Sequence, residues 1–159
     1  MEITEENALC KIAAYCSSAE RCKADVQERL QRWGVPYDGV RRILDYLVKE
    51  RFLDDERYCR AFVNDKFRFS KWGKQKIAQG LYMKKIPSEM AWRHLSALDE
   101  SDYLEVLRSL ITSKRKSISA KDDYDLNQKL IRFALSRGFE FKDIKRCLDV
   151  EVDYDEENL

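Results

Sequence analysis

The fold is decided by two stretches, VQERLQRWGVPYDGVRRILDYL at residues 26–47 and IAQGLYMKKIPSEMAWRHLSAL at residues 77–98. They superpose without gaps at a separation of 51 residues, which places Pro87 on Pro36, the only prolines in the chain. Five apolar positions coincide as well: Val26, Leu30, Val35, Leu44 and Leu47 fall on Ile77, Leu81, Ile86, Leu95 and Leu98. This coincidence indicates an internal repeat.

A third copy follows 53 residues further on, where Leu130, Ala134, Phe139, Ile144 and Leu148 fall on Ile77, Leu81, Ile86, Ala91 and Leu95. Each copy is preceded by apolar residues at the spacing of an amphipathic helix. These are Leu9, Ile12, Ala13 and Cys16 before the first copy, Tyr58, Phe62, Val63 and Phe69 before the second, and Leu104, Leu107, Leu110 and Ile111 before the third. The repeating unit is therefore three helices.

The turns agree with this interpretation. Gly34 and Gly138 hold the same repeat position, where a helix ends in the left-handed conformation that glycine adopts without strain. Lys85 stands there in the second copy, at a cost of about 1 kcal/mol if the conformation is kept. The two prolines suit the start of the next helix, and Asp54 and Asp55 suit the cap of the fourth helix.

We predict an all-α fold of three tandem three-helix repeats that form an elongated, curved, solenoid-like array. The expected helices cover residues 5–16, 20–33, 37–50, 54–69, 73–84, 88–98, 101–115, 122–137 and 141–150. The expected units are 1–50, 51–99 and 100–150, followed by an acidic tail at 151–159. The polar segment 113–123 is the expected loop.

Composition narrows the class of protein. No apolar run approaches eighteen residues and the N-terminal sequence lacks the order of a signal peptide, so we expect a cytoplasmic protein without membrane contact. The five cysteines form no CxxC pair, and we expect them to be reduced core residues.

A net charge of +1 conceals an uneven distribution. Between Lys66 and Ser88 there are seven basic residues and no acidic one, whereas the last eleven residues contain six acidic residues and no basic one. The basic stretch also contains Phe67, Phe69, Trp72 and Tyr82. It predicts a surface for a polyanion or an acidic partner. The rings have two open interpretations, because they either contact the partner or pack, Phe69 on the apolar stripe and Trp72 between helices.

Catalytic patterns are missing from the sequence. The string Trp72-Gly73-Lys74 lacks the glycine and the Ser/Thr of a phosphate-binding loop. His94 is the single histidine and is expected to be packed or half-buried. The cluster Asp54-Asp55-Glu56 is expected to cap a helix rather than bind a cation. We therefore expect neither an enzyme nor a cofactor or metal site.

From Phe52 the sequence reads FLDDERY and then AFV at residues 61–63. It resembles the RecX family, whose hallmark is an L-D-D-x-R-[FY] start, an A-F-V continuation, a basic-Gly turn and a Gly-Ile pair. The turn is Trp72-Gly73-Lys74 here, and Lys85-Ile86 departs from the family's glycine. The third repeat is similar at Lys129-Leu130, Arg132-Phe133, Arg137-Gly138-Phe139 and Asp143-Ile144. The resemblance covers residues 5–149, and the acidic extension after Val150 falls outside it.

The resemblance implies a non-enzymatic regulator in homologous recombination and the SOS response. Such proteins lie in the groove of the RecA filament on single-stranded DNA, limit its growth and inhibit recombinase, ATPase and coprotease activity. The implied partners are the RecA filament and its single-stranded DNA, and an extended monomer is the simplest expectation. The predicted binding surface consists of Lys66, Arg68, Lys71, Lys74, Lys76, Lys84, Lys85, Arg132 and Arg137.

Two alternatives remain open from the residues. A stand-alone DNA-binding module of helix-turn-helix type would read bases with Gln75, Gln79 and Arg93. A helical-repeat adapter would bind neither DNA nor recombinase, although the 34-residue period of TPR proteins is absent. The acidic tail either keeps the chain soluble or competes with nucleic acid for the basic surface.

Overall fold

The computed structural model describes residues 3–148, and this part of the chain is all-helical. The nine helices are α1 (Glu5–Ser18), α2 (Lys23–Arg32), α3 (Tyr37–Lys49), α4 (Asp55–Arg68), α5 (Lys74–Met83), α6 (Ser88–Ser96), α7 (Glu100–Arg115), α8 (Asp123–Ser136) and α9 (Phe141–Cys147). The predicted order and positions are confirmed. The ends differ by up to three residues, both at the start of α2, which begins after the extended segment that follows α1, and at the end of α9, which stops at Cys147.

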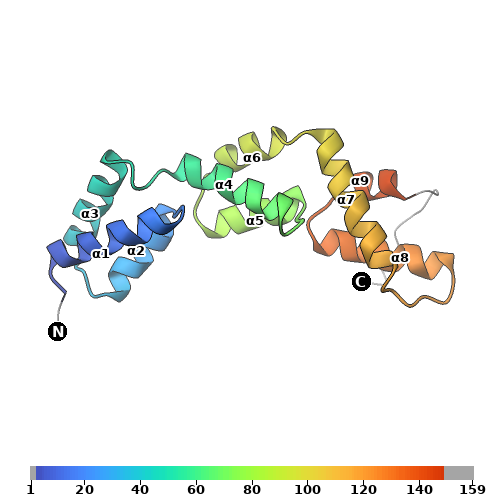
Figure 1. Cartoon of the computed structure of the whole chain (residues 1–159), viewed down its shortest axis with the longest axis horizontal. Helices are drawn as coiled ribbons and strands as arrows, with labels where there is room; N and C mark the ends of the chain where they lie inside the picture. The colour runs from blue at the N-terminus through green and yellow to red at the C-terminus, as the bar shows by residue number, and fades with distance from the viewer. Residues whose placement is uncertain (1–2, 149–159) are drawn as a thin grey trace.

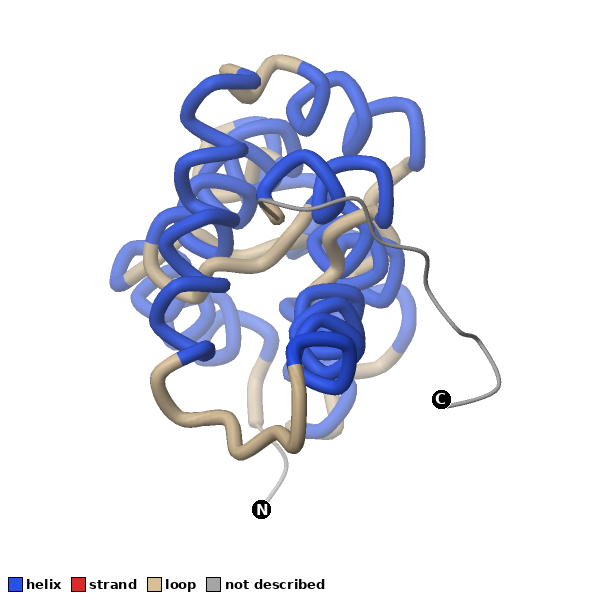
Figure 2. The backbone as a smooth tube through the Cα atoms, turned by 90° about the vertical axis from the view of Figure 1, so that its right-hand side faces the viewer, coloured by secondary structure: helices blue, strands red, loops and turns tan. Residues whose placement is uncertain are grey.

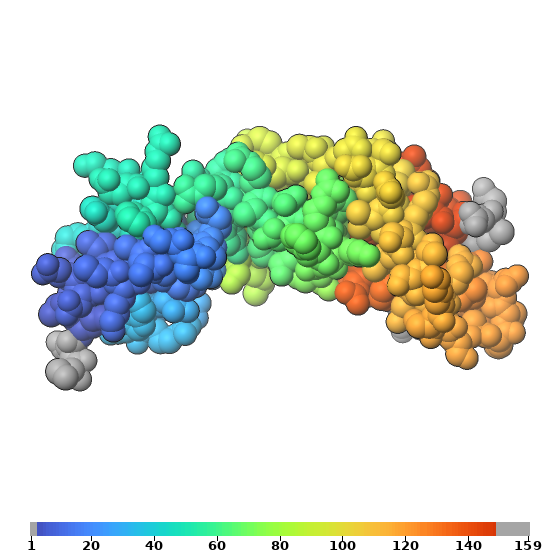
Figure 3. Space-filling view, in the orientation of Figure 1, coloured from blue at the N-terminus to red at the C-terminus, as the bar shows by residue number. Residues whose placement is uncertain are grey.

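The helices pack in three successive sets of three, α1–α3, α4–α6 and α7–α9. Figure 1 shows the sets strung along an arched, elongated body, and Figure 3 shows the same outline with side chains in place. Figure 2, viewed along the array, contains only helix and loop among the described residues. The predicted fold class of a curved three-repeat array is confirmed. The residue boundaries between the units stay a prediction, and the acidic tail at 151–159 lies outside the described residues.

Buried side chains form two clusters, and they divide the array unequally. The first repeat has its own core, built around Ile12, Leu30 and Leu47. The second and third repeats share one core, in which Phe67 of α4 stacks on Tyr103 of α7 with ring centroids 5.7 Å apart. Burial of each such large apolar side chain contributes about 1.5–3 kcal/mol. The second and third repeats are therefore joined by hydrophobic packing.

The expected left-handed turns occur in all three repeats. The backbone φ angle is 84° at Gly34, 60° at Lys85 and 95° at Gly138. Each residue lies two positions past the end of the second helix of its repeat, and the next helix begins three positions later. Lys85 thus keeps the glycine conformation at the energetic cost expected from its Cβ atom. Arg51 and Lys71 also have positive φ angles, 62° and 55°.

One assignment of the apolar stripe was wrong. Phe69 was placed on the buried face of α4, but 81% of it is exposed, and Phe67 is fully buried instead. The stripe Tyr58, Val63 and Phe67 follows the helical period only as far as the last turn, and α4 ends at Arg68. Phe69 lies beyond that end, where the chain turns away from the core.

The cysteines follow the expectation in part. Cys16, Cys22 and Cys59 are buried, Cys147 is half-buried and Cys10 is exposed. Burial raises the pKa of the Cys22 and Cys59 thiols to about 11, so these thiols stay protonated. Across residues 3–148 no helix has the length and apolar character needed to cross a membrane.

Candidate functional site

The FLDDERY stretch forms the joint between the first and second repeats. Leu53 is 1% exposed and belongs to the core of the first repeat, whereas Tyr58 belongs to the core shared by the other two. Between them, the Asp54 carboxylate accepts a hydrogen bond from the Arg57 amide at 3.1 Å and caps α4. Asp55 accepts from the Lys23 amide at 3.1 Å and so caps α2 of the preceding repeat. Capping was predicted, but for Asp55 on the wrong helix.

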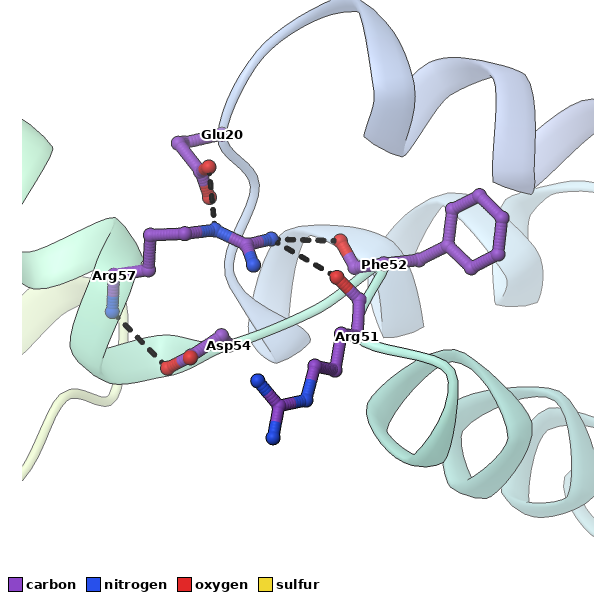
Figure 4. A network of polar contacts seen from close by, with 5 residues as sticks. All are labelled: Glu20, Arg51, Phe52, Asp54 and Arg57. Atoms are coloured by element: carbon purple, nitrogen blue, oxygen red, sulfur yellow. Dashed lines mark hydrogen bonds and ion pairs between the residues drawn. The ribbon is translucent and has the colours of Figure 1, made fainter.

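Arg57 fixes this joint from the centre (Figure 4). Its Nε donates to the Glu20 carboxylate at 2.6 Å, and its Nη2 donates to the carbonyl oxygens of Arg51 and Phe52 at 3.2 and 3.4 Å. One guanidinium thus binds the linker before α2 and the linker before α4. The planar, multi-donor shape of arginine suits this role in a way that lysine does not.

Glu56 connects α4 to α6 within the second repeat. Its Oε1 accepts hydrogen bonds from His94 Nε2 at 2.7 Å and from Arg93. The hydrogen bond from His94 is the main cause that lowers the pKa of the Glu56 carboxyl group. The His94 side chain is 17% exposed, as expected for a half-buried histidine. These contacts give the acidic cluster a structural role.

The second and third repeats meet at two glycines. The Gly73 amide donates to the Arg137 carbonyl at 2.7 Å, and the Gln75 amide donates to the Gly138 carbonyl at 3.0 Å. The backbones are so close that a Cβ atom on Gly73 would lie 2.5 Å from the Phe139 nitrogen. Glycine is required here by the close approach of two chain segments.

Tyr103 completes the cap of α5. Its hydroxyl accepts a hydrogen bond from the Lys74 amide at 2.9 Å. Burial raises the pKa of Tyr103 to about 12, so the phenol stays neutral and can accept this bond. Neither α2 nor α5 receives a capping hydrogen bond from the side chain of its own N-cap residue, whereas α8 of the last repeat does, from Asp122. The following repeat therefore caps the second helix of each earlier repeat.

Two of the predicted basic residues lie over Trp72, which is half-buried against the shared core. The Lys66 Nζ atom lies 4.7 Å from the Trp72 ring centroid, and the Lys76 Nζ atom lies 4.6 Å from it. Lys74 Nζ lies 4.7 Å from the ring of Tyr103. Within residues 3–148 none of these three lysines is within ion-pair distance of a carboxylate. The rings restrain these ammonium groups, which form no ion pair in this part of the chain.

Other members of the predicted set have different surroundings. Lys84 Nζ pairs with Asp25 of the first repeat at 2.9 Å, and this hydrogen bond raises the lysine pKa. Arg68 pairs with Asp102 of the third repeat at 3.4 Å. Lys85 is exposed at its left-handed turn, and Lys71 is half-buried at another. Lys84 and Arg68 thus link repeats, which sequence reasoning could not show because their partners are distant in the chain.

The two arginines of the third repeat that belong to the predicted surface lie in different places. Arg137 ends α8, and its guanidinium lies 5.0 Å from the Phe133 ring centroid. The Lys114 Nζ atom lies 4.8 Å from the same ring. Arg132 is exposed on α8. The structure therefore does not gather all nine residues into one patch: Lys66 and Lys76 lie over Trp72 and Arg137 lies over Phe133, whereas the other six have different surroundings.

The residues proposed for base reading are largely engaged within the protein. The Gln75 side-chain amide donates to Glu140 at 2.7 Å, and Arg93 pairs with Glu56. Gln79 remains exposed. Among the described residues no group of three or more His, Cys, Asp or Glu side chains could hold a metal ion. The lysines over Trp72 provide the chemistry of a binding site for anionic groups.

Comparison with known protein families identifies two of the three repeats. The family model for the second three-helix domain of RecX matches residues 54–91, and the model for its third three-helix domain matches residues 100–148. Together they cover more than half of the chain. Both models begin at or beside an N-cap aspartate, Asp54 of α4 and Asp99 of α7.

Relatives and solved structures agree with this assignment. The Regulatory protein RecX of Clostridium botulinum strain Eklund 17B is 28% identical over 150 residues, which is 92% of this chain and 70% of the relative. That of Chlorobium limicola is 28% identical over 76% of this chain and 74% of its own. The crystal structure of RecX from Lactobacillus salivarius matches with a TM-score of 0.79 at 19% identity, covering 90% of this chain and 93% of that one. A second crystal structure, of a regulatory protein RecX, gives a TM-score of 0.83 at 20% identity over 90% and 72% of the two chains. At these identities the solved structures show the fold alone, whereas the matched domain models show that this chain belongs to the RecX family of regulatory proteins.

Proposed function

We propose that this chain binds the RecA filament on single-stranded DNA and limits its growth, thereby inhibiting recombinase, ATPase and coprotease activity. The observation that supports the proposal best is the positive charge of Lys66, Lys74 and Lys76, which lies over aromatic rings and forms no ion pair within residues 3–148, in the middle of an elongated array. A filament groove lined by protein and DNA requires a long ligand with positive charge along it.

The mechanism we propose is bridging. The second and third repeats share one core and form a continuous body, so contacts made by both are held at a fixed separation. A rigid ligand that contacts two neighbouring recombinase protomers opposes their relative movement. Addition of the next protomer would be blocked, or loss of the last one accelerated.

The test is DNA-dependent ATP hydrolysis by the cognate RecA, with this chain added below one copy per recombinase. We expect inhibition by the wild-type chain and its loss in the double variant Lys66→Glu/Lys76→Glu. Lys84 is left unchanged because it pairs with Asp25, so its reversal would disturb the first joint. The matched control is Arg41→Glu/Arg60→Glu, which reverses two exposed charges elsewhere.

Each outcome decides the proposal. Inhibition by the control but not by Lys66→Glu/Lys76→Glu supports filament regulation through the surface around Trp72. Normal inhibition by that double variant contradicts the site. No effect of the wild-type chain on intact filaments contradicts the function and favours a stand-alone DNA-binding module or an adapter. Sequence preference for duplex DNA separates those two.

A further inference from the structure

Each repeat contains an aromatic ring with two cations over it. In the first repeat, the guanidinium carbons of Arg21 and Arg29 both lie 3.9 Å from the ring centroid of Tyr15. The second repeat has Lys66 and Lys76 over Trp72, and the third has Lys114 and Arg137 over Phe133. We call these three groups the ring clamps.

The ring clamps occupy the same seam in every repeat, where the first helix meets the second. Tyr15 belongs to α1 and Arg29 to α2, just as Lys66 belongs to α4 and Lys76 to α5. In the third repeat the seam is between α7, which carries Lys114, and α8. The helix pairs α1–α2, α4–α5 and α7–α8 follow one another along the elongated body (Figure 1), so the clamps succeed one another along its length.

The pairing of one ring with two cations is kept in all three repeats, although ring and cation do not occupy the same repeat positions. Tyr15 and Lys66 hold equivalent repeat positions, 51 residues apart, and so do Arg21 and Trp72. Ring and cation have thus changed places between the first and second repeats. Phe133 likewise holds the position of Arg29. Sequence comparison at single positions would miss this pattern, since only the pairing of ring and cation is kept.

None of the six clamped cations lies within ion-pair distance of a carboxylate in residues 3–148. The cations in ion pairs there form a separate set: Arg32, Arg42, Arg57, Arg68, Lys84, Arg93, Lys129, Lys142 and Arg146. A ring restrains a cation without neutralising it, so each clamp presents positive charge in a preorganised position.

We infer that the succession of ring clamps binds the sugar–phosphate backbone of a single DNA strand, one clamp contacting phosphates at successive points. A nucleic-acid strand carries negative charge uniformly along its length, so a succession of cations that form no ion pairs matches the strand. This inference rests on the proposed function for its target, the DNA of the filament. It extends the site to the first repeat, adds Lys114 in the third, and gives Tyr15, Trp72 and Phe133 a positioning role.

The test is the salt dependence of binding of the full chain to a labelled single-stranded oligonucleotide, followed by fluorescence anisotropy. Each phosphate contact adds about 0.7 to the slope of log affinity against log salt. The variant Lys114→Gln/Arg137→Gln should therefore lower the slope by about 1.4, and Arg29→Gln by about 0.7. The matched control Lys142→Gln/Arg146→Gln removes two paired cations from the same repeat and should leave the slope unchanged.

A ring variant separates positioning from charge. Phe133→Leu keeps both cations, so the slope should stay the same while affinity falls about threefold to tenfold. An unchanged slope in Lys114→Gln/Arg137→Gln, an equal loss in its control, or tighter binding to duplex than to single strand would overturn the inference. Inhibition of ATP hydrolysis measured on the same proteins is independent. If the slopes behave as expected but the wild-type chain does not inhibit, the proposed function fails and the clamps stand.

Discussion

Gly34 and Gly138 have the same repeat position and nearly the same backbone, but very different neighbours. Their φ angles are 84° and 95°. A Cβ atom on Gly34 would meet nothing within 4 Å, whereas one on Gly138 would collide with the Lys76 Cβ atom and lie 2.5 Å from the Lys76 nitrogen. Alanine at the two sites therefore separates backbone strain from collision at the joint between the second and third repeats.

The magnitudes follow from these surroundings. Gly34→Ala should cost only the left-handed strain, about 1 kcal/mol. Gly138→Ala should cost the same strain and a further 1–3 kcal/mol or so, because α5 must move away from a close-packed backbone. That movement also weakens the bond from the Gln75 amide to the Gly138 carbonyl. We expect total losses of about 1 and about 2–4 kcal/mol in the free energy of unfolding.

The assay is urea unfolding followed by circular dichroism, with both variants and wild type at one protein concentration. Lys85→Gly should change the free energy of unfolding in the opposite direction, because it removes a Cβ atom from a left-handed residue with a φ angle of 60°. We expect it to stabilise the chain by up to about 1 kcal/mol. Equal losses for the two alanine variants would refute the close approach at Gly138. A destabilising Lys85→Gly would refute the strain argument for this turn.

Three further perturbations test the joints. Arg57→Ala should lower the free energy of unfolding by about 1.5–3 kcal/mol, because the charged hydrogen bonds of Arg57 are lost. Arg60→Ala changes an exposed residue of the same helix and should cost little, so equal losses in urea unfolding would contradict the role of Arg57 at the joint. Deletion of residues 100–159 removes the acceptors that cap α5, so amide hydrogen exchange in its first turn should accelerate, and unchanged protection would count against capping by the next repeat. The pKa of Glu56 is lowered below its ordinary value of 4.5, chiefly by the hydrogen bond from His94, so its ionised form stabilises the fold above that pH and this contribution is lost as the pH falls. Glu56→Gln should therefore flatten the acid side of the stability curve, and a curve parallel to that of wild type would show that the pairing is unimportant.

Local structure could be predicted well from the sequence because each position of the repeat can be compared among three copies. Helix order, the left-handed turn at Lys85 and the half-buried His94 all depend on residues near one another in the chain or on the alignment of the repeats. The error at Phe69 has the same origin, since periodicity alone does not say that α4 ends at Arg68.

Long-range partners were beyond the reach of the sequence. Lys84 was grouped with the binding surface because its neighbours in the chain are basic, but its nearest charge is Asp25, 59 residues earlier. The same limit hid the ring clamps of the first repeat. Arg21 and Arg29 lie in a stretch of balanced charge, and only folding brings both of them over Tyr15.

The residues that reveal the family overlap only in part with those that we propose to bind, since the motifs include Trp72 and Arg137 but neither Tyr15 nor Lys114. Asp54, Asp55 and Arg57 hold the first two repeats together, and Gly73 and Gly138 hold the last two. The residues at the joints cannot be exchanged freely, because each carboxylate caps one particular backbone amide and each glycine leaves room for a closely packed backbone segment. A phosphate-binding clamp tolerates exchange of ring and cation, as its three forms in this chain illustrate. A motif search consequently finds the joints and part of the clamps, whereas the rest of the binding surface has to be found from cations without ion pairs in the folded protein.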